Sequence, residues 1–224
     1  MVQITADGKV YLKILYWGMA GSGKTTILDT LYKITKEQKK DIIPTGNLTK
    51  IAMASGATMY FDRGIFQSTN QNKFFYHVYT VAGQHRFSPL RKKIFKGTDG
   101  IILVVESQTK FLEDNIESLK ELKNLTRGKL INEIPLITML NKRDLNNIIS
   151  EEDFIHVLKE EGLWYEPDNE LYTWNPIIYK TCAIYEKNSN IYKSFYECIR
   201  RVLMGNENFP NPYIFKPSHS PDDL

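Results

Sequence analysis

The sequence predicts an α/β fold with a mostly parallel six-stranded sheet, one antiparallel strand and helices on both faces. Short runs rich in β-branched and aromatic residues alternate with segments whose apolar residues recur at helical spacing, which is typical of such sheets. One pair of runs is joined by a link too short for a crossover helix. A glycine-rich turn also joins the first run to the first helical segment.

Six runs have the length and composition of strands. They cover residues 10–17, 58–65, 74–81, 100–105, 134–140 and 174–179. Runs that are apolar throughout favour strands covered on both faces, as in parallel sheets. The polar link 67–73 joins the second run to the third and leaves no room for the helix that parallel neighbours need. We therefore expect these two strands to be antiparallel.

Four segments carry apolar stripes of the kind found on amphipathic helices. The stripes lie within residues 27–34, 112–122, 154–158 and 191–202. Ser150 and Asp153 open the third segment in a pattern that resembles a capping box. A further helix is expected to begin near Ser88. We interpret the basic run 91–93 within it as a solvated helix face, with contact to an acidic partner or a membrane as the alternative.

The pattern predicts one domain over residues 10–204, an N-terminal extension over 1–9 and a proline-rich tail over 205–224. The tail holds four of the nine prolines, a density that opposes helix and sheet. Its closely spaced aromatic residues, Phe209, Tyr213 and Phe215, are consistent with contact between its first half and the body.

Composition and charge exclude several classes of protein. The 29 basic and 26 acidic residues leave a net charge of +3, which gives no argument for nucleic-acid binding. Two cysteines, Cys182 and Cys198, are fewer than a secreted disulfide scaffold normally carries. The sequence has no recognisable signal peptide, membrane span or lipidation motif. We expect a cytoplasmic protein with no stable membrane anchor.

Residues 18–25 read G-M-A-G-S-G-K-T and fit the phosphate-binding loop of P-loop NTPases. Glycines let the backbone bring N–H groups to phosphate oxygens, and the N-terminus of the following helix adds a favourable dipole. Lys24 can reach the β- and γ-phosphates, and the Thr25 hydroxyl can ligate Mg²⁺. The predicted phosphate-binding residues are Gly18, Ala20, Gly21, Ser22, Gly23, Lys24, Thr25 and Thr26.

A motif for reading the base, N-K-R-D at 141–144, follows the fifth run. A carboxylate at Asp144 can accept hydrogen bonds from guanine N1–H and the N2 amino group, donors that adenine lacks, so adenine would leave the acceptor unpaired. Alone the motif is short, and a polar turn is the alternative. A backbone N–H of the stretch 181–183, T-C-A, can meet guanine O6. The predicted base-contacting residues are Asn141, Lys142, Asp144, Cys182 and Ala183.

Together these motifs resemble the Ras-like small GTPases, over about residues 10–204. Within that superfamily the chain resembles most the MglA group of prokaryotic polarity GTPases. The motifs that carry this resemblance are G-S-G-K-T-T at 21–26, Y-T-V-A-G-Q at 79–84, K-G-T-D-G at 96–100, E-S-Q at 106–108 and N-K-R-D-L at 141–145. The resemblance implies that the chain binds GTP or GDP with Mg²⁺ and acts as a molecular switch.

One departure from the superfamily pattern concerns the metal. Ras-like proteins usually have an aspartate near Mg²⁺ in the motif D-x-x-G, whereas this chain has Thr80 there, as the resembled group does. We expect Asp62, on the second strand, to support Mg²⁺ instead, with an ordinary exposed aspartate as the alternative. Thr58 resembles the switch threonine that closes onto Mg²⁺, and the alternative is a plain strand threonine.

Two segments are expected to sense the γ-phosphate, residues 42–63 and the segment that begins at Gly83. The Gly83 N–H can bond the γ-phosphate, and Gln84 can orient the attacking water. The resemblance implies a switch arginine in the same chain, but Ala57 stands at that position. Arg63 and Arg86 are possible substitutes, although each also fits a surface residue. The predicted catalytic residues are Gln84, Lys24, Gly83 and Arg63.

The leading hypothesis is a GTP-binding and GTP-hydrolysing switch that is slow without an activating protein and controls partner binding. The resemblance implies an effector, a roadblock-type activator and a role in polarity or motility. One alternative is a GTP-binding scaffold with little turnover, which the missing aspartate and arginine keep open. The other is a P-loop kinase that transfers phosphate to a small molecule.

Overall fold

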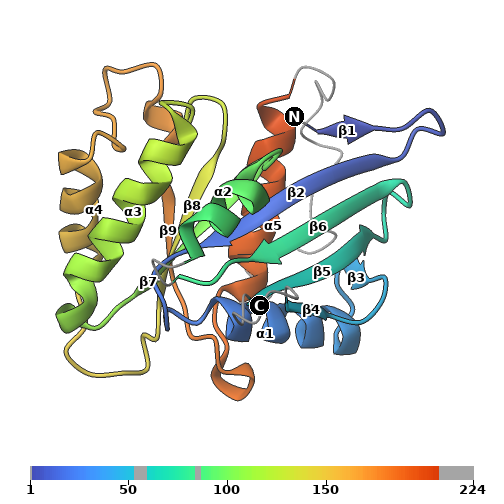
Figure 1. The fold of residues 1–224 in the computed structure, drawn as a ribbon, viewed down its shortest axis with the longest axis horizontal. Helices are drawn as coiled ribbons and strands as arrows, with labels where there is room; N and C mark the ends of the chain where they lie inside the picture. The colour runs from blue at the N-terminus through green and yellow to red at the C-terminus, as the bar shows by residue number, and fades with distance from the viewer. Residues whose placement is uncertain (1, 53–59, 84–86, 207–224) are drawn as a thin grey trace.

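The computed structural model describes residues 2–52, 60–83 and 87–206, and these residues form the expected α/β fold (Figure 1). The helices are α1 (Lys24–Glu37), α2 (Ser88–Phe95), α3 (Leu112–Thr126), α4 (Glu151–Glu160) and α5 (Ile191–Met204), with 3₁₀ turns at Thr109–Phe111, Tyr172–Trp174 and Tyr185–Lys187. The strands are β1 (Gln3–Ile4), β2 (Val10–Trp17), β3 (Ile42–Pro44), β4 (Thr49–Ala52), β5 (Tyr60–Ser68), β6 (Phe74–Thr80), β7 (Gly100–Glu106), β8 (Leu136–Asn141) and β9 (Ile177–Lys180).

The sheet is built around a parallel core, in the order β3-β5-β6-β2-β7-β8-β9. The pairs β2–β6, β2–β7, β7–β8 and β8–β9 are all parallel. The strand β5 runs antiparallel to β6, with Gly64 opposite Val78. The antiparallel pair predicted from the short polar link is therefore confirmed, and all six expected strands are present.

Three short strands extend the sheet beyond the six that the sequence predicted. The strand β1, in the N-terminal extension, pairs antiparallel with β2, while β3 and β4 both pair antiparallel with β5. They contain only 2, 3 and 4 residues, too few to show a hydrophobic pattern. They pair because β2 has no partner on its β7 side before Ile14, and β5 has no other partner on the side away from β6. Such unpaired backbone groups can bind a further strand.

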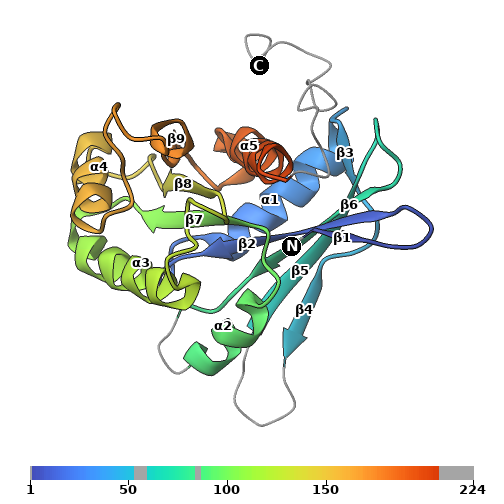
Figure 2. The same ribbon diagram turned by 90° about the horizontal axis from the view of Figure 1, so that it is seen from above.

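Helices cover the two faces of the sheet in separate groups, as Figure 2 shows. On one face, α1 and α5 bury Ile27, Leu31 and Phe195 in a single apolar cluster with β2. On the other face, Leu119 of α3 and Phe154 of α4 belong to a second cluster. The strand β7 lies between the two clusters with all seven residues buried. Its continuous apolar run is therefore explained by cover on both faces.

The third helical segment begins where its capping pattern predicts. The Asp153 amide donates to Ser150 Oγ at 3.0 Å, and the Ser150 amide donates to Asp153 Oδ2 at 2.8 Å. The capping box is therefore present at the start of α4. Of the predicted tail, the structure describes only Gly205 and Asn206, which follow α5.

The parallel strands bring the sequence motifs to one edge of the sheet. The loops that follow β2, β6, β7, β8 and β9 carry the segments 18–23, 81–83, 107–108, 142–144 and 181–183. In open α/β sheets, ligands bind beyond the carboxyl ends of the strands. Across the described part of the chain, no helix combines the length and the apolar character needed to cross a bilayer.

Candidate functional site

The loop between β2 and α1 contains two glycines that no other residue could replace without movement. Gly18 has a φ of +150°, and a Cβ there would lie 2.2 Å from the Val104 carbonyl oxygen. Gly23 has a φ of +100°, and a Cβ there would lie 2.4 Å from Asn141 Nδ2. Both positions combine an unfavourable φ for L-residues with a close neighbour. The glycines of the phosphate-loop motif therefore let the loop pack against the ends of β7 and β8.

The side chain of Lys24 lies within this loop. Its Nζ donates to the carbonyl oxygens of Gly18 at 2.9 Å and Met19 at 2.7 Å, and the residue is only 6% exposed. Burial first, and the positive charge of Arg91 second, lower the pKa of Lys24 to about 7. A phosphate group beside this ammonium would stabilise its charged form.

Three residues from different elements meet beside the start of α1. The Thr25 hydroxyl donates to Asp62 Oδ2 at 2.6 Å, and the Thr80 hydroxyl donates to the same oxygen at 3.0 Å. The Asp62 amide in turn donates to Thr80 Oγ1 at 3.2 Å. Asp62 is 6% exposed, so it is not the ordinary exposed aspartate of the alternative interpretation. Strand β5 thus places a carboxylate against the threonine predicted to ligate Mg²⁺.

These groups line one cavity of about 570 Å³. The P-loop residues Lys24 and Thr25 form part of its wall, and Asp62 and Gly83 form another part. Gly83 approaches the loop so closely that a Cβ there would lie 2.2 Å from the Ala20 amide nitrogen. Gly83, which is predicted to contact the γ-phosphate, therefore lies at the same cavity as the P-loop.

Arg63, which was selected as a catalytic candidate, does not line this cavity. Side chains alternate across a strand, so Arg63 points to the face opposite Asp62. Its guanidinium lies over the ring of Tyr79, 5.7 Å from the centroid. Thr80, which follows Tyr79, is the residue that turns toward Asp62. In this arrangement the Arg63 guanidinium lies on the face of β5 opposite Asp62.

The base-reading motif is tied directly to the phosphate loop. Asn141 is fully buried, and its Nδ2 donates to the Ser22 carbonyl at 2.8 Å. Lys142, in the left-handed region with φ of 65°, forms an ion pair with Glu106. Glu106 ends β7 and is 1% exposed, so its carboxylate holds the Lys142 ammonium at the carboxyl edge of the sheet.

Asp144 and the T-C-A stretch lie side by side at the same edge. Burial, the largest cause, raises the pKa of the Cys182 thiol. A backbone hydrogen bond at Ile184 opposes this rise, and the Asp144 carboxylate adds to it. Asp144 itself is exposed, so its carboxylate is accessible to a ligand. The Cys182 amide donates to Ser189 Oγ at 3.0 Å, which makes Ala183 the better candidate for guanine O6. The Ala183 carbonyl accepts from Thr30 at 2.5 Å.

Several predicted residues lie outside the described residues, namely Thr58, Gln84, Arg86 and the position Ala57. Two residues that contact segments of the candidate site, Glu106 and Arg91, were assigned no role by the motif analysis. Glu106 belongs to the E-S-Q stretch, which supported the family resemblance but was given no chemical role. Arg91 was interpreted as part of a solvated face, and this is wrong because Arg91 is 2% exposed.

Arg91 connects α2 to two other parts of the molecule. Its guanidinium contacts both carboxylate oxygens of Glu121, at 2.7 and 2.6 Å, and donates to the Ala82 carbonyl at 3.0 Å. It also lies 5.6 Å from the ring centroid of Trp17. These contacts fix α2 to α3 and to the residue before Gly83. No sequence spacing predicts the contact with Glu121, because the two residues are 30 positions apart.

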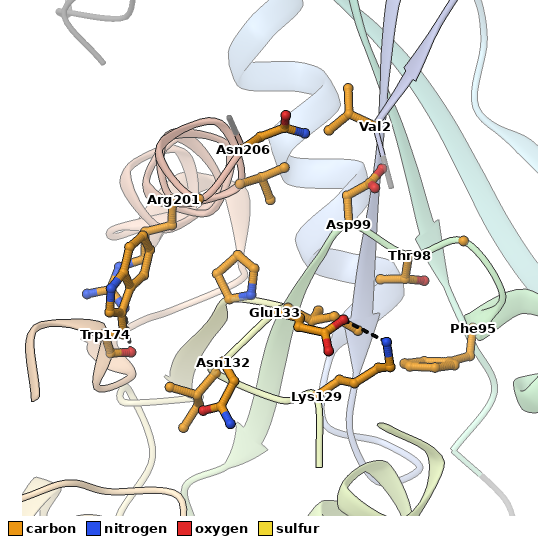
Figure 3. Close-up of a pocket in the computed structure, with 16 residues that line it drawn as sticks. Val2, Phe95, Thr98, Asp99, Lys129, Asn132, Glu133, Trp174, Arg201 and Asn206 are labelled. Carbon is orange, nitrogen blue, oxygen red and sulfur yellow. Dashed lines mark hydrogen bonds and ion pairs between the residues drawn. The ribbon is translucent and has the colours of Figure 1, made fainter. Parts of the chain in front are cut away.

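A second cavity, of about 410 Å³, lies at the opposite edge of the sheet (Figure 3). It is lined by residues that precede β7 and β8 and by the end of α5, including Asp99, Pro135 and Arg201. Lys129 and Glu133 form an ion pair of 2.6 Å at its margin. None of the predicted site residues lines this cavity, whereas residues of the P-loop, Asp62 and Gly83 line the first one.

An α/β sheet with a P-loop and a base motif at one carboxyl edge defines a P-loop nucleotide-binding protein. The family model of the ADP-ribosylation factor family matches residues 2–196, so the chain belongs to that family of Ras-like small GTPases. The superfamily resemblance drawn from the motifs is thereby confirmed.

Curated relatives agree with this assignment. The chain is 34% identical over 160 residues to the mutual gliding-motility protein MglA of Myxococcus xanthus. The aligned segment covers 69% of this chain and 79% of MglA. It is 30% identical over 139 residues to the human ADP-ribosylation factor-like protein 4A, covering 61% of this chain and 60% of that protein. It is also 26% identical over 163 residues to ADP-ribosylation factor J of Dictyostelium discoideum, covering 71% of this chain and 76% of that factor.

Small GTPases generally bind GTP or GDP with Mg²⁺, and the residues present fit these ligands. Gly21 lines the cavity with a φ of +78°, and a Cβ built there would have no neighbour within 4 Å, so the loop is open to a ligand at this point. Lys24 supplies a cation for phosphate, and Thr25 and Asp62 supply the oxygen donors that Mg²⁺ and its bound waters prefer. Asp144 lies exposed where a guanine base would be read.

Proposed function

We propose that this chain is a molecular switch that binds GTP, hydrolyses it slowly and controls partner binding through the segments 42–63 and 83 onward. The observation that carries the proposal is the convergence of Lys24, Thr25, Asp62 and Gly83 on one cavity, with Asn141 bonded to Ser22 beside it. A G domain over 10–204, with the extension 1–9 and the tail 205–224, is the unit we assign to this activity.

The proposed metal site uses Thr25 as a direct ligand of Mg²⁺, with Thr58 joining it in the GTP state. Asp62 takes the part that the usual aspartate plays, because its carboxylate already accepts the Thr25 hydroxyl at 2.6 Å. Thr80 occupies the position of that usual aspartate and supports Asp62 through its own hydroxyl. A carboxylate placed one hydrogen bond from a ligand orients that ligand and raises metal affinity.

The proposed base and phosphate contacts follow the motifs. Asp144 accepts the guanine N1–H and amino group, Lys142 lies along the base, and the Ala183 N–H meets O6. Gly18, Ala20, Gly21, Ser22, Gly23, Lys24, Thr25 and Thr26 hold the phosphates. For hydrolysis, the Gly83 N–H bonds the γ-phosphate, Gln84 orients the water, and Lys24 neutralises the developing charge.

We also propose that hydrolysis depends on an activating partner. Arg63 lies over Tyr79 rather than at the phosphates, and Ala57 stands where the resembled group has its arginine. An arginine adds about 10³ to 10⁵ to the rate of such reactions. A roadblock-type protein that binds beside the segment around Gln84 is the partner we favour. The similarity to MglA, named for mutual gliding motility, makes polarity or motility the process we propose.

The missing catalytic arginine also favours a second candidate, a GTP-binding scaffold with little turnover. One experiment separates the two functions and the remaining alternative of a kinase. GTP and ATP binding with Mg²⁺ is measured first, followed by phosphate release with and without a roadblock-type protein. The switch predicts a preference for GTP and activated release. Tight GTP binding without release under any activator would favour the scaffold, and a preference for ATP would refute both.

The base assignment has its own test, the substitution Asp144→Asn. The amide would donate where the carboxylate accepts, so guanine affinity should fall and xanthine affinity should rise. Competition between GDP and xanthosine diphosphate for the protein measures the change. Unchanged guanine affinity would show that Asp144 does not read the base.

A further inference from the structure

A groove of about 790 Å³ runs between α2 and α3, away from the nucleotide cavity. We call it the α2–α3 groove. Its basic lining residues are Lys92, Lys96, Lys120 and Arg127, and its apolar floor includes Phe95 and Leu125. The four basic side chains are exposed, and the two apolar ones are partly buried. The groove thus combines an accessible basic rim with an apolar floor.

The groove carries more positive than negative charge. Its two acids are Glu117 and Glu121. The Glu121 carboxylate is held at both oxygens by Arg91, at 2.7 and 2.6 Å, and also accepts from Ser88 at 3.1 Å. Arg91 therefore neutralises Glu121, and Lys120 pairs at 3.6 Å with Glu161, which does not line the groove. Glu117 is then one acid beside Lys92, Lys96 and Arg127. A ligand complementary to the groove is acidic.

The same arginine links the groove to the nucleotide site. Arg91 donates to the Ala82 carbonyl at 3.0 Å, and Ala82 precedes Gly83, which lies against the P-loop. A displacement of Gly83 would therefore change the position of the Ala82 carbonyl that Arg91 binds. Because Arg91 lies on α2, one wall of the groove would move with it.

We propose that the α2–α3 groove is the docking site for an acidic segment of a partner protein. The apolar floor between Phe95 and Leu125 accepts an apolar side chain of that segment, and Lys92, Lys96 and Arg127 meet its carboxylates. A concave groove of this kind fits a protein segment better than a flat anionic membrane. Its dependence on nucleotide rests on the proposed switch function, whereas docking itself does not.

The test measures binding of a fluorescein-labelled peptide of alternating Glu and Leu residues by fluorescence anisotropy, using the full chain. The matching peptide of Lys and Leu is the ligand control. Lys92→Glu/Lys96→Glu should weaken acidic-peptide binding about tenfold or more, and added salt should weaken it further, since exposed charges are screened. Lys36→Glu/Lys39→Glu is the matched control, because it makes the same change in charge at Lys36 in the last turn of α1 and at Lys39 just beyond it.

Four outcomes decide the proposal. Weaker acidic-peptide binding by Lys92→Glu/Lys96→Glu, but not by the control variant, supports the proposal. Lys92→Gln/Lys96→Gln removes the positive charges without adding negative ones and should weaken binding less, which a general loss of folding would not explain. An equal loss in both double variants would reduce the interaction to net charge and overturn the proposal. No binding of the acidic peptide would also overturn it. Binding of anionic phosphatidylserine vesicles that requires Lys92 and Lys96, without peptide binding, would assign the groove to a membrane instead.

The dependence on nucleotide is tested separately, with the protein loaded with GDP or with a non-hydrolysable GTP analogue. A difference of about threefold or more between the two states supports the link through Arg91. Equal affinity in both states would overturn that link while leaving docking in place. Failure to load guanine nucleotide at all would refute the proposed function and not the groove, whose binding is measured without nucleotide.

Discussion

Replacing Asp62 by asparagine is the sharpest test of the proposed metal site. The substitution keeps the shape of the side chain but removes the charge that accepts the hydroxyls of Thr25 at 2.6 Å and Thr80 at 3.0 Å. A hydrogen bond to a charged group contributes about 1.5–3 kcal/mol, and a neutral one about 0.5–1.5 kcal/mol. If the amide oxygen takes the place of Oδ2, each bond loses about 1 kcal/mol, or roughly 2 kcal/mol for both.

About 1.4 kcal/mol corresponds to a tenfold change in an equilibrium constant. We therefore expect Mg²⁺ affinity of the nucleotide complex to fall by about 10–100-fold, the range typical for residues that orient metal ligands. The assay is dissociation of a fluorescent GDP analogue across a series of Mg²⁺ concentrations. The midpoint of the Mg²⁺ dependence should move to higher concentration, whereas dissociation in excess chelator should change little.

Asp168→Asn is the control for this experiment, because Asp168 is an exposed acid remote from the site motifs in sequence. It should leave the Mg²⁺ midpoint in place. Thermal unfolding of each variant separates a loss of metal affinity from a loss of fold. If Asp62→Asn folds and keeps the wild-type midpoint, Asp62 does not support the metal, and the metal site must be assigned to other residues.

Three further predictions follow from buried charges. Glu106→Gln removes the ion pair that holds Lys142, so GDP dissociation, followed by stopped-flow fluorescence, should become about tenfold faster; an unchanged rate would show that Lys142 is oriented without it. Arg91→Ala leaves the Glu121 carboxylate without its buried partner, so urea unfolding should show a loss of about 3 kcal/mol; less than about 1 kcal/mol would show the pair to be dispensable. Burial and the charges of Arg63 and Lys13 lower the pKa of His77 below 6.5; protonation then favours the unfolded chain, so the fall in melting temperature from pH 7 to pH 5 should be smaller in His77→Asn, and an equal fall would refute this.

The central strands and the phosphate loop could be predicted because their signals are contiguous in the chain. The strand β7 is buried along its whole length, so its sequence is apolar without interruption. The strand β9 was expected from residue 174 but begins at Ile177, because Tyr172–Trp174 form a 3₁₀ turn whose aromatic residues resemble a strand. The short strands β3 and β4 could not be predicted, because they owe their existence to pairing with β5.

Apart from Asp62, which was selected because Thr80 replaces the usual aspartate, the site was predictable where its parts are short motifs. Asn141 and Ser22 meet through a bond that spans 119 positions, yet each lies in a recognisable motif, and the fold brings the motifs together. Glu106 and Arg91 lie in no such motif. Their importance comes from partners, Lys142 and Glu121, that become neighbours only when the helices and strands have packed.

The contrast between Asp62 and Arg63 shows which physical rule separates the two cases. Both are charged, adjacent and within the same strand. Asp62 was selected to replace the missing aspartate of D-x-x-G, and Arg63 to replace the missing switch arginine. A strand assigns neighbouring side chains to opposite faces, so at most one of them can reach the P-loop. The registry of β5 against β6 decides which one, because Arg63 is paired with Tyr79 while Asp62 accepts the hydroxyl of Thr80. The sequence offers no turn or spacing that sets this registry to within one residue, and a shift of one would exchange the two side chains. The departure at Thr80 is therefore best understood together with Asp62: a threonine on β6 can donate to a carboxylate on β5, whereas an aspartate at the same place would repel it.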